Sequence, residues 1–192
     1  MQGFCLALHR RRTVVRRGLG TRQVTQQLDK TTAKNAKLVE LSLGKFAIVD
    51  ADDFERLSIY KWCAVRRRHI WYAKTLRQDG SHLSMHRLIT NAPRHLMVDH
   101  RDHNGLNNRK QNLRLCNNAE NQYNRLPHRG GTSKHKGVFL DKQYNKYRAI
   151  ICHNSKRYNL GRFENEDDAA RAYDKKARKL FGEFAYLNFP NE

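Results

Sequence analysis

Cysteines and long apolar runs are scarce in this sequence, and each shortage excludes a class of protein. The four cysteines, Cys5, Cys63, Cys116 and Cys152, are widely scattered, and none forms a C-x-x-C pair. They therefore predict neither a structural zinc site nor a disulfide framework, and we expect reduced thiols. No apolar run approaches the roughly 18–20 residues that a bilayer-spanning helix needs. We accordingly expect no membrane partner.

Acidic side chains are also scarce relative to basic ones. The chain has 38 Lys and Arg against 18 Asp and Glu, which gives a formal net charge of +20. A charge of this size repels itself in the folded state and normally reflects a polyanionic partner. Nucleic acid is the favoured partner, because each neutralised phosphate releases counterions and adds affinity. A membrane surface is the alternative, which we disfavour because the basic segments fall on predicted strands.

The first 36 residues differ from the rest in composition. They are rich in Lys and Arg and contain only one acid, Asp29. A disordered basic arm is the first interpretation of residues 1–36. An Arg-rich, acid-poor organelle transit peptide is a minor alternative, as is upstream sequence included by a wrong start. We expect no fold in this segment.

After this arm, short apolar segments predict a β-rich region. Residues 46–49 form a continuous apolar run, and residues 52–58 have the pattern of one helical turn. Residues 63–65 and 70–73 read as a hairpin around the basic turn at 66–68. The segment therefore predicts an α+β arrangement of small strands.

The segment from Val98 to Arg125 carries the residues that suggest chemistry. Asp99 and His100 end a short predicted strand, and a polar excursion with an Asn-Gly turn signal brings the chain back. Residues 113–116 form a second predicted strand. This order of strand, loop and strand places a carboxylate and an imidazole at the edge of a small scaffold.

A short helix is predicted directly after these strands. Asn117 and Glu120 have the spacing of a capping box, which predicts a helix through Tyr123. Asn121 lies one turn into this helix, where Asp99 and His100 could face it. A carboxylate with an amide oxygen makes a hard oxygen shell that suits Mg²⁺. An adjacent neutral imidazole can take a proton from water, so hydrolysis of a phosphodiester is the indicated reaction.

The stretch MHRLI…VDH…NLRLCNNAENQ resembles the HNH endonuclease family, and closely its phage and intron homing members. The spacings from His100 to Asn112 and to Asn121 fit the ββα-metal (HNH/His-Me) finger of that family. The resemblance implies that Asp99 and Asn121 bind Mg²⁺ or Mn²⁺ and that His100 is the general base. Many relatives have His at the last position, where this chain has Asn121.

The same resemblance implies supporting roles for two further residues. Asn112 would cross-link the loop and hold His100 in place. His86 lies in a recurrent M-H-R-L-I segment, which we expect to be a lead-in strand, and would support the site or touch phosphate. The resemblance covers about residues 39–125, so we expect a nuclease domain at 37–126 with its ββα-metal core at 96–125.

A second unit is predicted beyond a linker at residues 127–132. Residues 133–190 contain strand signals at 136–140, 146–152 and 156–163 and an amphipathic helix at 166–180. Alternation turns one sheet face toward the helix and leaves a largely basic face open: Lys146, Arg148, Ile150, Arg157 and Asn159. Such a face can enter the major groove of DNA. A solvated cationic face on a structural domain is the alternative.

This unit resembles the plant ethylene-response-factor (APETALA-type) DNA-binding domain. The resemblance rests on the K-G-V start, the L-G-R-F corner, the D-D-A-A-R-A-Y-D helix and the L-N-F-P end. It implies DNA contacts by Lys136 and Arg157, with Lys146, Arg148 and Arg162 as the other basic candidates. Other reader positions differ from the plant domains, so no target sequence is implied.

Together these patterns predict an α+β, metal-dependent endonuclease of the homing type that acts on double-stranded DNA. Nicking or double-strand cleavage, and a monomer or a dimer, all stay open. The resemblance implies a cytoplasmic location in a phage or bacterial context. Two rivals remain: a non-enzymatic DNA-binding protein with a decayed nuclease segment, and an RNA-binding or structural nucleoprotein.

Overall fold

The computed structural model describes residues 35–128 and 130–192 and has the mixed α+β character expected from the sequence. The expected basic arm, residues 1–36, lies almost wholly outside the described residues. The elements of the first half are β1 (Ala36–Glu40), β2 (Phe46–Asp50), α2 (Ala51–Ser58), β3 (Cys63–Arg67), β4 (Ile70–Leu76), β5 (His82–Ser84) and α3 (Met85–Thr90). Those of the second half are β6 (Met97–His100), β7 (Leu113–Cys116), α4 (Asn118–Tyr123), β8 (Val138–Asp141), β9 (Lys146–His153), β10 (Lys156–Phe163) and α5 (Glu166–Phe181). Short 3₁₀ turns are η2 (Ser42–Gly44), η3 (Lys110–Asn112) and η4 (Gly182–Phe184).

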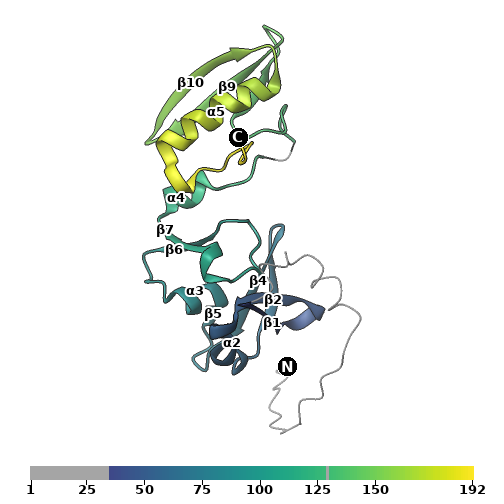
Figure 1. Cartoon of the computed structure of the whole chain (residues 1–192), viewed down its shortest axis with the longest axis vertical. Coiled ribbons are helices and arrows are strands. Elements are labelled where there is room, and N and C mark those ends of the chain that lie inside the picture. The colour runs from purple at the N-terminus through teal and green to yellow at the C-terminus, as the bar shows by residue number, and fades with distance from the viewer. Residues whose placement is uncertain (1–34, 129) are drawn as a thin grey trace, which may run out of the picture.

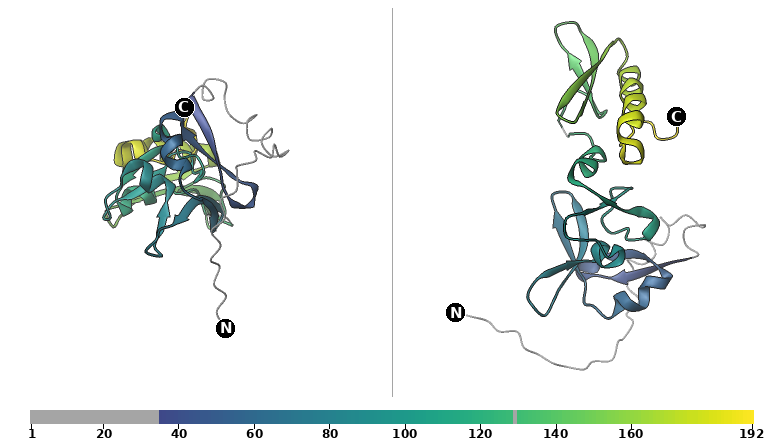
Figure 2. Two further views of the ribbon diagram at one scale, coloured as in Figure 1. Left: turned by 90° about the horizontal axis from the view of Figure 1, so that it is seen from below. Right: turned by 90° about the vertical axis from the view of Figure 1, so that its left-hand side faces the viewer.

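The strands form small antiparallel sheets, and the molecule is elongated (Figure 1). The pairings are β1–β2, β3–β4–β5, β6–β7 and β10–β9–β8. Elements β1 to β5 lie at one end, the last sheet and α5 lie at the other, and β6, β7 and α4 lie between them, as the side view in Figure 2 also shows. The β6–β7–α4 unit is therefore the junction of the molecule.

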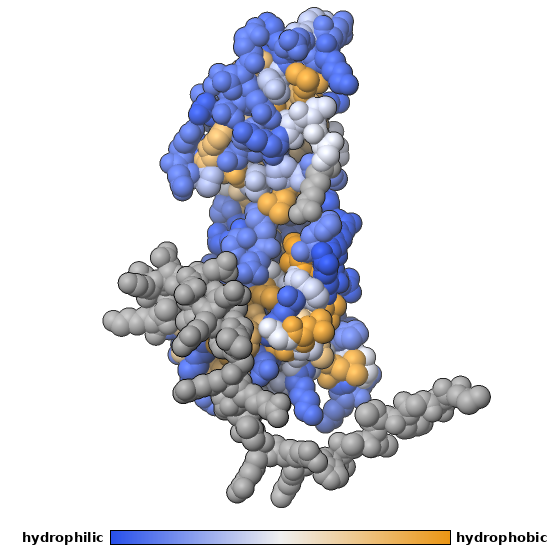
Figure 3. All heavy atoms as spheres, turned by 90° about the vertical axis from the view of Figure 1, so that its right-hand side faces the viewer, coloured by the Kyte–Doolittle hydropathy of each residue, from blue (hydrophilic) through white to orange (hydrophobic). Residues whose placement is uncertain are grey.

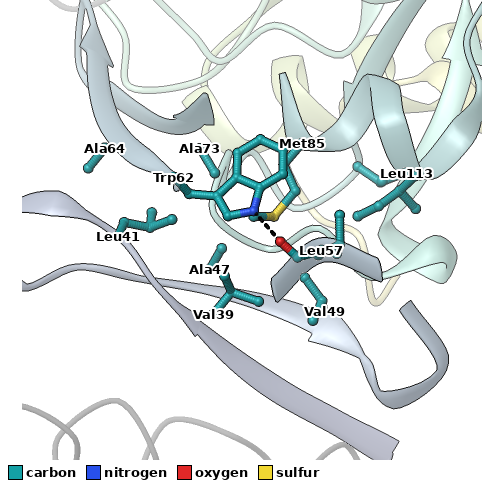
Figure 4. Close-up of a cluster of buried hydrophobic side chains, with 11 residues drawn as sticks. Val39, Leu41, Ala47, Val49, Leu57, Trp62, Ala64, Ala73, Met85 and Leu113 are labelled. Carbon is teal, nitrogen blue, oxygen red and sulfur yellow. Dashed lines mark hydrogen bonds between the residues drawn. The ribbon is translucent and has the colours of Figure 1, made fainter. Parts of the chain in front are cut away.

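The N-terminal half is built on one apolar cluster around Trp62 (Figure 4). The Trp62 indole N–H donates to the carbonyl of Leu57 at 2.8 Å, which satisfies its polar atom inside the core. The cluster also takes Met85 from α3 and Leu113 from β7. Because Leu113 belongs to it, the β6–β7 hairpin is anchored on the same core as the first two sheets.

The C-terminal half packs α5 across one face of the β8–β9–β10 sheet. Ala149 and Ile151 of β9 and Tyr173 and Ala177 of α5 lie in its core clusters. The residues expected to face the helix do so, and the strands and helix begin and end within about two residues of the expected bounds. A bulge at Gly161 shifts the β9–β10 register.

The expected linker separates the two halves less completely than the sequence suggests. Residues 127, 128 and 130–132 contain no helix or strand, as expected. However, Tyr123 at the end of α4 stacks on Phe181 of α5, with ring centroids 3.8 Å apart and planes at 8°. The Tyr186 N–H also donates to the carbonyl of Tyr123 at 3.1 Å. Tyr123, the last residue of α4, thus packs against the core of the C-terminal half.

One face of the molecule carries mainly polar side chains (Figure 3). On the face drawn in Figure 3, hydrophilic residues cover most of both lobes and apolar ones form only small, separate patches. No described helix has the length and apolar content required to cross a membrane.

Candidate active site

The site is organised by the loop that leaves β6 at His100. This loop lies against β2 through a parallel bridge between Ile48 and Asn107. The Ile48 N–H donates to the carbonyl of Leu106 at 2.8 Å, and the Asn108 N–H donates to the carbonyl of Ile48 at 2.7 Å. A polar loop of twelve residues is therefore fixed to a strand of the main core.

The side chain of Asn112 ties together the two ends of this loop. Its amide N–H groups donate to the carboxylate of Asp102 and to the carbonyl of Asn107, both at 2.8 Å, while its oxygen accepts from the Asp102 N–H. Its backbone carbonyl accepts from Arg101 at 2.9 Å. Asn112 thus holds the residues that follow His100, although no hydrogen bond to the His100 ring is present among the described residues.

His100 lies in a cluster of three mutually edge-on rings. The His100 and His86 ring centroids are 5.1 Å apart with planes at 89°, and Tyr72 lies 5.9 Å from His100 and 6.0 Å from His86. Gly105 closes the cluster, because a Cβ there would meet the Trp71 carbonyl at 2.4 Å and the Tyr72 ring at 2.7 Å. Only a glycine lets the loop lie this close to β4.

Burial keeps the two imidazoles of this cluster neutral. It lowers the pKa of His86 to about 3, assisted by the nearby His100 ring and by the positive charges of Arg87 and Lys74. Burial also lowers the pKa of His100 below its ordinary value, while Asn108 and two nearby carboxylates oppose the shift. Asn108 acts by proximity here, since its amide forms no hydrogen bond of ordinary geometry. A neutral imidazole can accept a proton, which is what a general base requires.

Several buried polar atoms at this site have no partner within the described residues. They are Nε2 of His100, Nδ1 of His86, Oδ1 of Asn107 and both amide atoms of Asn108. Asn108 is 0% exposed. Buried polar groups are normally hydrogen-bonded, so such a group of unpaired atoms marks a place where water, an ion or a ligand is expected.

Asp99 points toward β7 and α4, where two side chains hold it. Arg114 donates to one carboxylate oxygen through Nε at 2.8 Å and Nη2 at 2.7 Å. Asn124 Nδ2 lies 2.9 and 3.1 Å from the two oxygens. Asn121, the partner expected from the sequence, instead points its amide at the sulfur of Met97 at 3.8 Å. The structure therefore brings Asp99 to Asn124 and not to Asn121.

The rotation of α4 explains this difference. The capping box at Asn117 and Glu120 is present in both directions, so the helix begins where the sequence predicts. Residues three apart on a helix are rotated by about 60° from each other. Asn124 is 5% exposed and lies under β6, whereas the half-buried Asn121 lies further round the helix. The helix was predicted correctly, but its inward-facing position was not.

The expectation for the segment around His86 is also corrected. We expected a lead-in strand, but residues 85–90 form α3. Met85 and Ile89 are buried in the core, and their spacing of four is that of one face of a helix. The helix nevertheless delivers His86 to the ring cluster described above.

The divalent cation implied by the family resemblance suits the oxygen donors present. Asp99 and Asn124 are adjacent, and a half-turn of the Asn124 amide would put its oxygen beside the carboxylate. Carboxylate and amide oxygens are the ligands of hard cations such as Mg²⁺. The chemistry of these donors therefore fits, with the Arg114 cation as an opposing neighbour.

A second possible metal-binding group lies elsewhere. His135, Glu166 and Asp167 at the start of α5 could together hold an ion. Their atoms are already engaged: His135 Nε2 is 2.8 Å from Asp167, and Glu166 accepts from Ser133 and Lys134. These contacts are sufficient to explain the group as a helix N-terminus that is closed by local hydrogen bonds.

The expected basic face is present on the open side of the C-terminal sheet. Arg148 of β9 pairs in register with Phe139 and Arg162 on the flanking strands, and Arg157 helps to line the same shallow hollow. Arg162 is bound to Asp141 at 2.9 Å. The Arg148 Nε donates to Asn159 at 3.2 Å, and Lys146 is paired with Glu164 at 2.8 Å.

Lys136, which the resemblance implies is a DNA contact, lies away from this face. Its ammonium donates to the carbonyl of Tyr123 and lies 5.3 Å from the centre of the Tyr186 ring. Burial lowers its pKa to about 8, with a contribution from Arg125. The chain turns away from the sheet before β8, so Lys136 contacts α4 at the junction of the two halves.

The C-terminal half also contacts Arg114, the residue that holds Asp99. Glu183 of η4 accepts from Arg114 Nη1 through its carbonyl and from Arg101 through its carboxylate at 2.7 Å. The Arg114 guanidinium lies 4.4 Å from the centre of the Phe184 ring. Sequence reasoning assigned no role to Arg114, Asn124 or Tyr72. Only Asn124 had a signal in the sequence, because it lies three residues after Asn121 and therefore near it on a helix.

Comparison with known proteins identifies the family. An uncharacterised HNH endonuclease of Acanthamoeba polyphaga mimivirus is 32% identical over 151 residues, which is 76% of this chain and 75% of the relative. No family model matches the chain, and no solved structure is significantly similar to it. At this identity and coverage, the chain belongs to the HNH endonuclease family.

Proposed function

We propose that the protein is a metal-dependent DNA endonuclease whose β6–β7–α4 unit is a ββα-metal finger. The observation that carries this proposal is the buried His100, which follows Asp99 in β6. Its Nε2 has no hydrogen-bond partner among the described residues. A structural histidine at 6% exposure would normally have a partner for each nitrogen. A neutral imidazole with a free nitrogen is suited to accept a proton from the attacking water.

The other residues hold this base and the acidic group next to it. Asn112 fixes the loop after His100, and His86 and Tyr72 pack on its ring. Asp99 would hold a Mg²⁺ or Mn²⁺ ion together with an amide oxygen of α4, supplied by Asn121 as the family motif implies or by Asn124 as the contacts favour. Such an ion would stabilise the charge that develops on the scissile phosphate and on the leaving oxygen.

The C-terminal sheet and helix would be an APETALA-type DNA-binding domain that tethers the nuclease to duplex DNA. Support comes from the open sheet face, which carries Arg148, Arg157 and Arg162, and from Lys146 beside it. Linking a weak catalytic binder to a second binding unit raises its effective concentration at the site. A homing-type role and a cytoplasmic location are part of the same proposal.

Cleavage of supercoiled plasmid DNA with Mg²⁺ or Mn²⁺ tests the proposal. We expect conversion to open circle or linear DNA by the wild type, loss of this activity with EDTA, and a loss of at least about 100-fold in His100→Ala. His95→Ala, which removes an exposed histidine nearby, is the matched control and should cut normally.

Binding of plasmid without any cutting, under both metals, would support the rival interpretation of a DNA-binding protein with an inactive nuclease segment. Preferential binding of RNA over duplex DNA in competition would support the nucleoprotein alternative. Separate Asn121→Ala and Asn124→Ala variants, assayed for Mn²⁺ affinity, decide which amide serves the metal.

A further inference from the structure

The outer face of the β3–β4–β5 sheet lies directly beside the His100 ring cluster. Side chains alternate between the faces of a strand, so Tyr72 and Lys74 of β4 share one face. Arg67 belongs to the same face, because it pairs in register with Ile70. The opposite face, with Ala64 and Ala73, is buried in the core. The row of Arg67, Tyr72 and Lys74 thus lies on the face turned away from the core, with Arg67 exposed and Tyr72 and Lys74 half-buried.

The cations of this row have no counterion among the described residues. Arg67 and Lys74 form no ion pair within residues 35–128 and 130–192, whereas many cations of the C-terminal half do. Burial and the nearby Arg67 lower the pKa of Lys74, so the two charges are close enough to repel each other. Between Lys61 and Val98 the only acid is Asp79. Two like charges held together without an acid indicate an anionic ligand.

Tyr72 connects this row to the reacting centre. Its ring contacts His86 and His100, and its hydroxyl has no hydrogen-bond partner among the described residues. Burial and Asp99 raise its pKa, so the hydroxyl stays protonated and available as a donor. The segment from Ile70 to Lys74 covers about 13 Å of strand, which is longer than a single phosphodiester group.

We infer that Arg67, Tyr72 and Lys74 form a binding site for the phosphates that flank the scissile one on the DNA strand being cut. The neighbouring phosphates would bind Arg67 and Lys74, and the Tyr72 hydroxyl would donate to the strand between them. The attacked phosphorus would then lie over His100. This inference rests on the proposed nuclease function and adds a DNA contact separate from the C-terminal sheet.

The test compares two double variants that remove the same charge. Arg67→Ala with Lys74→Ala removes the row, and Lys61→Ala with Arg77→Ala removes two exposed cations at the other end of the hairpin. Plasmid nicking is measured over a range of KCl concentrations. Relative to the control, the row variant should raise KM about tenfold, leave kcat unchanged, and reduce the log–log salt slope by about two.

The Tyr72→Phe variant adds a second readout, since it removes only the hydroxyl and keeps the ring cluster. It should raise KM about threefold at unchanged kcat, with the salt slope of the wild type. Equal KM values for the two double variants would overturn the inference, as would a fall in kcat at unchanged KM. A wild type that cuts no DNA would instead contradict the proposed function, so the two failures can be distinguished.

Discussion

The unpaired buried polar atoms of the described residues all lie in the N-terminal half of the molecule and none lies in the C-terminal half. In the C-terminal half, the carboxylate of Asp174 is 2% exposed and accepts three hydrogen bonds, from the backbone and side chain of Asn188 and from Phe189. In the nuclease half, the side-chain amide of Asn108 is fully buried and has no hydrogen-bond partner within the described residues. A satisfied buried group stabilises a fold, whereas an unsatisfied one reduces stability unless a ligand completes it. The contrast supports the proposal that the chemistry takes place in the first half.

Asp53 does not weaken this contrast. One of its oxygens lacks a hydrogen bond of ordinary geometry, yet Lys110 faces it at 3.1 Å and Arg56 binds the other oxygen at 2.7 Å. The remaining unpaired atoms belong to His86, His100, Asn107 and Asn108, which all lie near the loop after β6.

The largest expected effects come from two glycines, one in each half. A Cβ on Gly137, where φ is +76°, would meet the Tyr173 ring at 2.1 Å and the Ile150 carbonyl at 2.7 Å. Gly137→Ala should therefore destabilise the C-terminal half by about 4 kcal/mol or more and greatly weaken DNA binding. Gly105→Ala pushes the loop off Tyr72 and should abolish cleavage while duplex binding survives.

Plasmid cleavage and gel-shift binding, measured on both glycine variants, check this pair of outcomes. Gly44→Ala is the control for backbone strain alone, because Gly44 also has a positive φ, +62°, but no atom lies within 4 Å of a Cβ at that position. Loss of cleavage and of binding together in Gly105→Ala would show that the halves do not act separately.

Alanine substitutions of a hydrogen-bonded and of an unpaired buried side chain should change the free energy of unfolding by different amounts. Asp174→Ala leaves three donors without an acceptor and should lower the free energy of unfolding by about 3 kcal/mol. Asn108→Ala removes an amide that has no partner, so its effect on stability should stay below about 1 kcal/mol while cleavage falls. Urea unfolding followed by fluorescence measures both changes. A large loss of stability in Asn108→Ala would mean that its amide is satisfied in solution.

The local elements of this fold were readable from the sequence because they depend on short-range patterns. The capping box at Asn117 and the alternation along β9 and β10 each depend on neighbouring residues, and both are present in the structure. The helix at residues 85–90 was predicted as a strand, since residues four apart, such as the buried Met85 and Ile89, share a face in either structure.

Contacts between distant residues could not be read in the same way. Arg114 binds Asp99 and also Glu183, which lies 69 residues further along the chain. No local pattern encodes that distance. For the same reason, no local pattern predicts that the ammonium of Lys136 donates to the carbonyl of Tyr123. The family motif predicts the chemistry in residues 99–121, and the choice between Asn121 and Asn124 depends on how α4 packs.

The ring cluster should make the stability of the nuclease half sensitive to acid. Because the pKa of His86 is lowered to about 3, the folded state stays unprotonated where the unfolded chain, with a pKa near 6.5, takes up a proton. The stability that this difference provides is complete above about pH 6.5 and is lost as the pH falls below it. Between pH 7.5 and 5.0 the loss from His86 should be about 2 kcal/mol.

Unfolding by urea at the two pH values, in the wild type and in His86→Phe, measures this contribution. Phenylalanine keeps the ring contacts with Tyr72 and His100 but cannot be protonated. The variant should therefore lose about 2 kcal/mol less than the wild type over this range. An identical loss in both proteins would mean that His86 is accessible to protons in the folded state.

The smallest effect concerns the cations of the C-terminal sheet, which contrast with the unpaired row on β3 and β4. Arg148→Ala with Arg157→Ala should weaken duplex binding and reduce its log–log salt slope by about two, because two phosphate contacts are removed. Lys175→Ala with Lys179→Ala, which alters the exposed side of α5, is the charge-matched control. Binding is measured by fluorescence anisotropy over a range of KCl concentrations. If both double variants change the slope equally, net charge alone attracts DNA, and the open sheet face is not its binding surface.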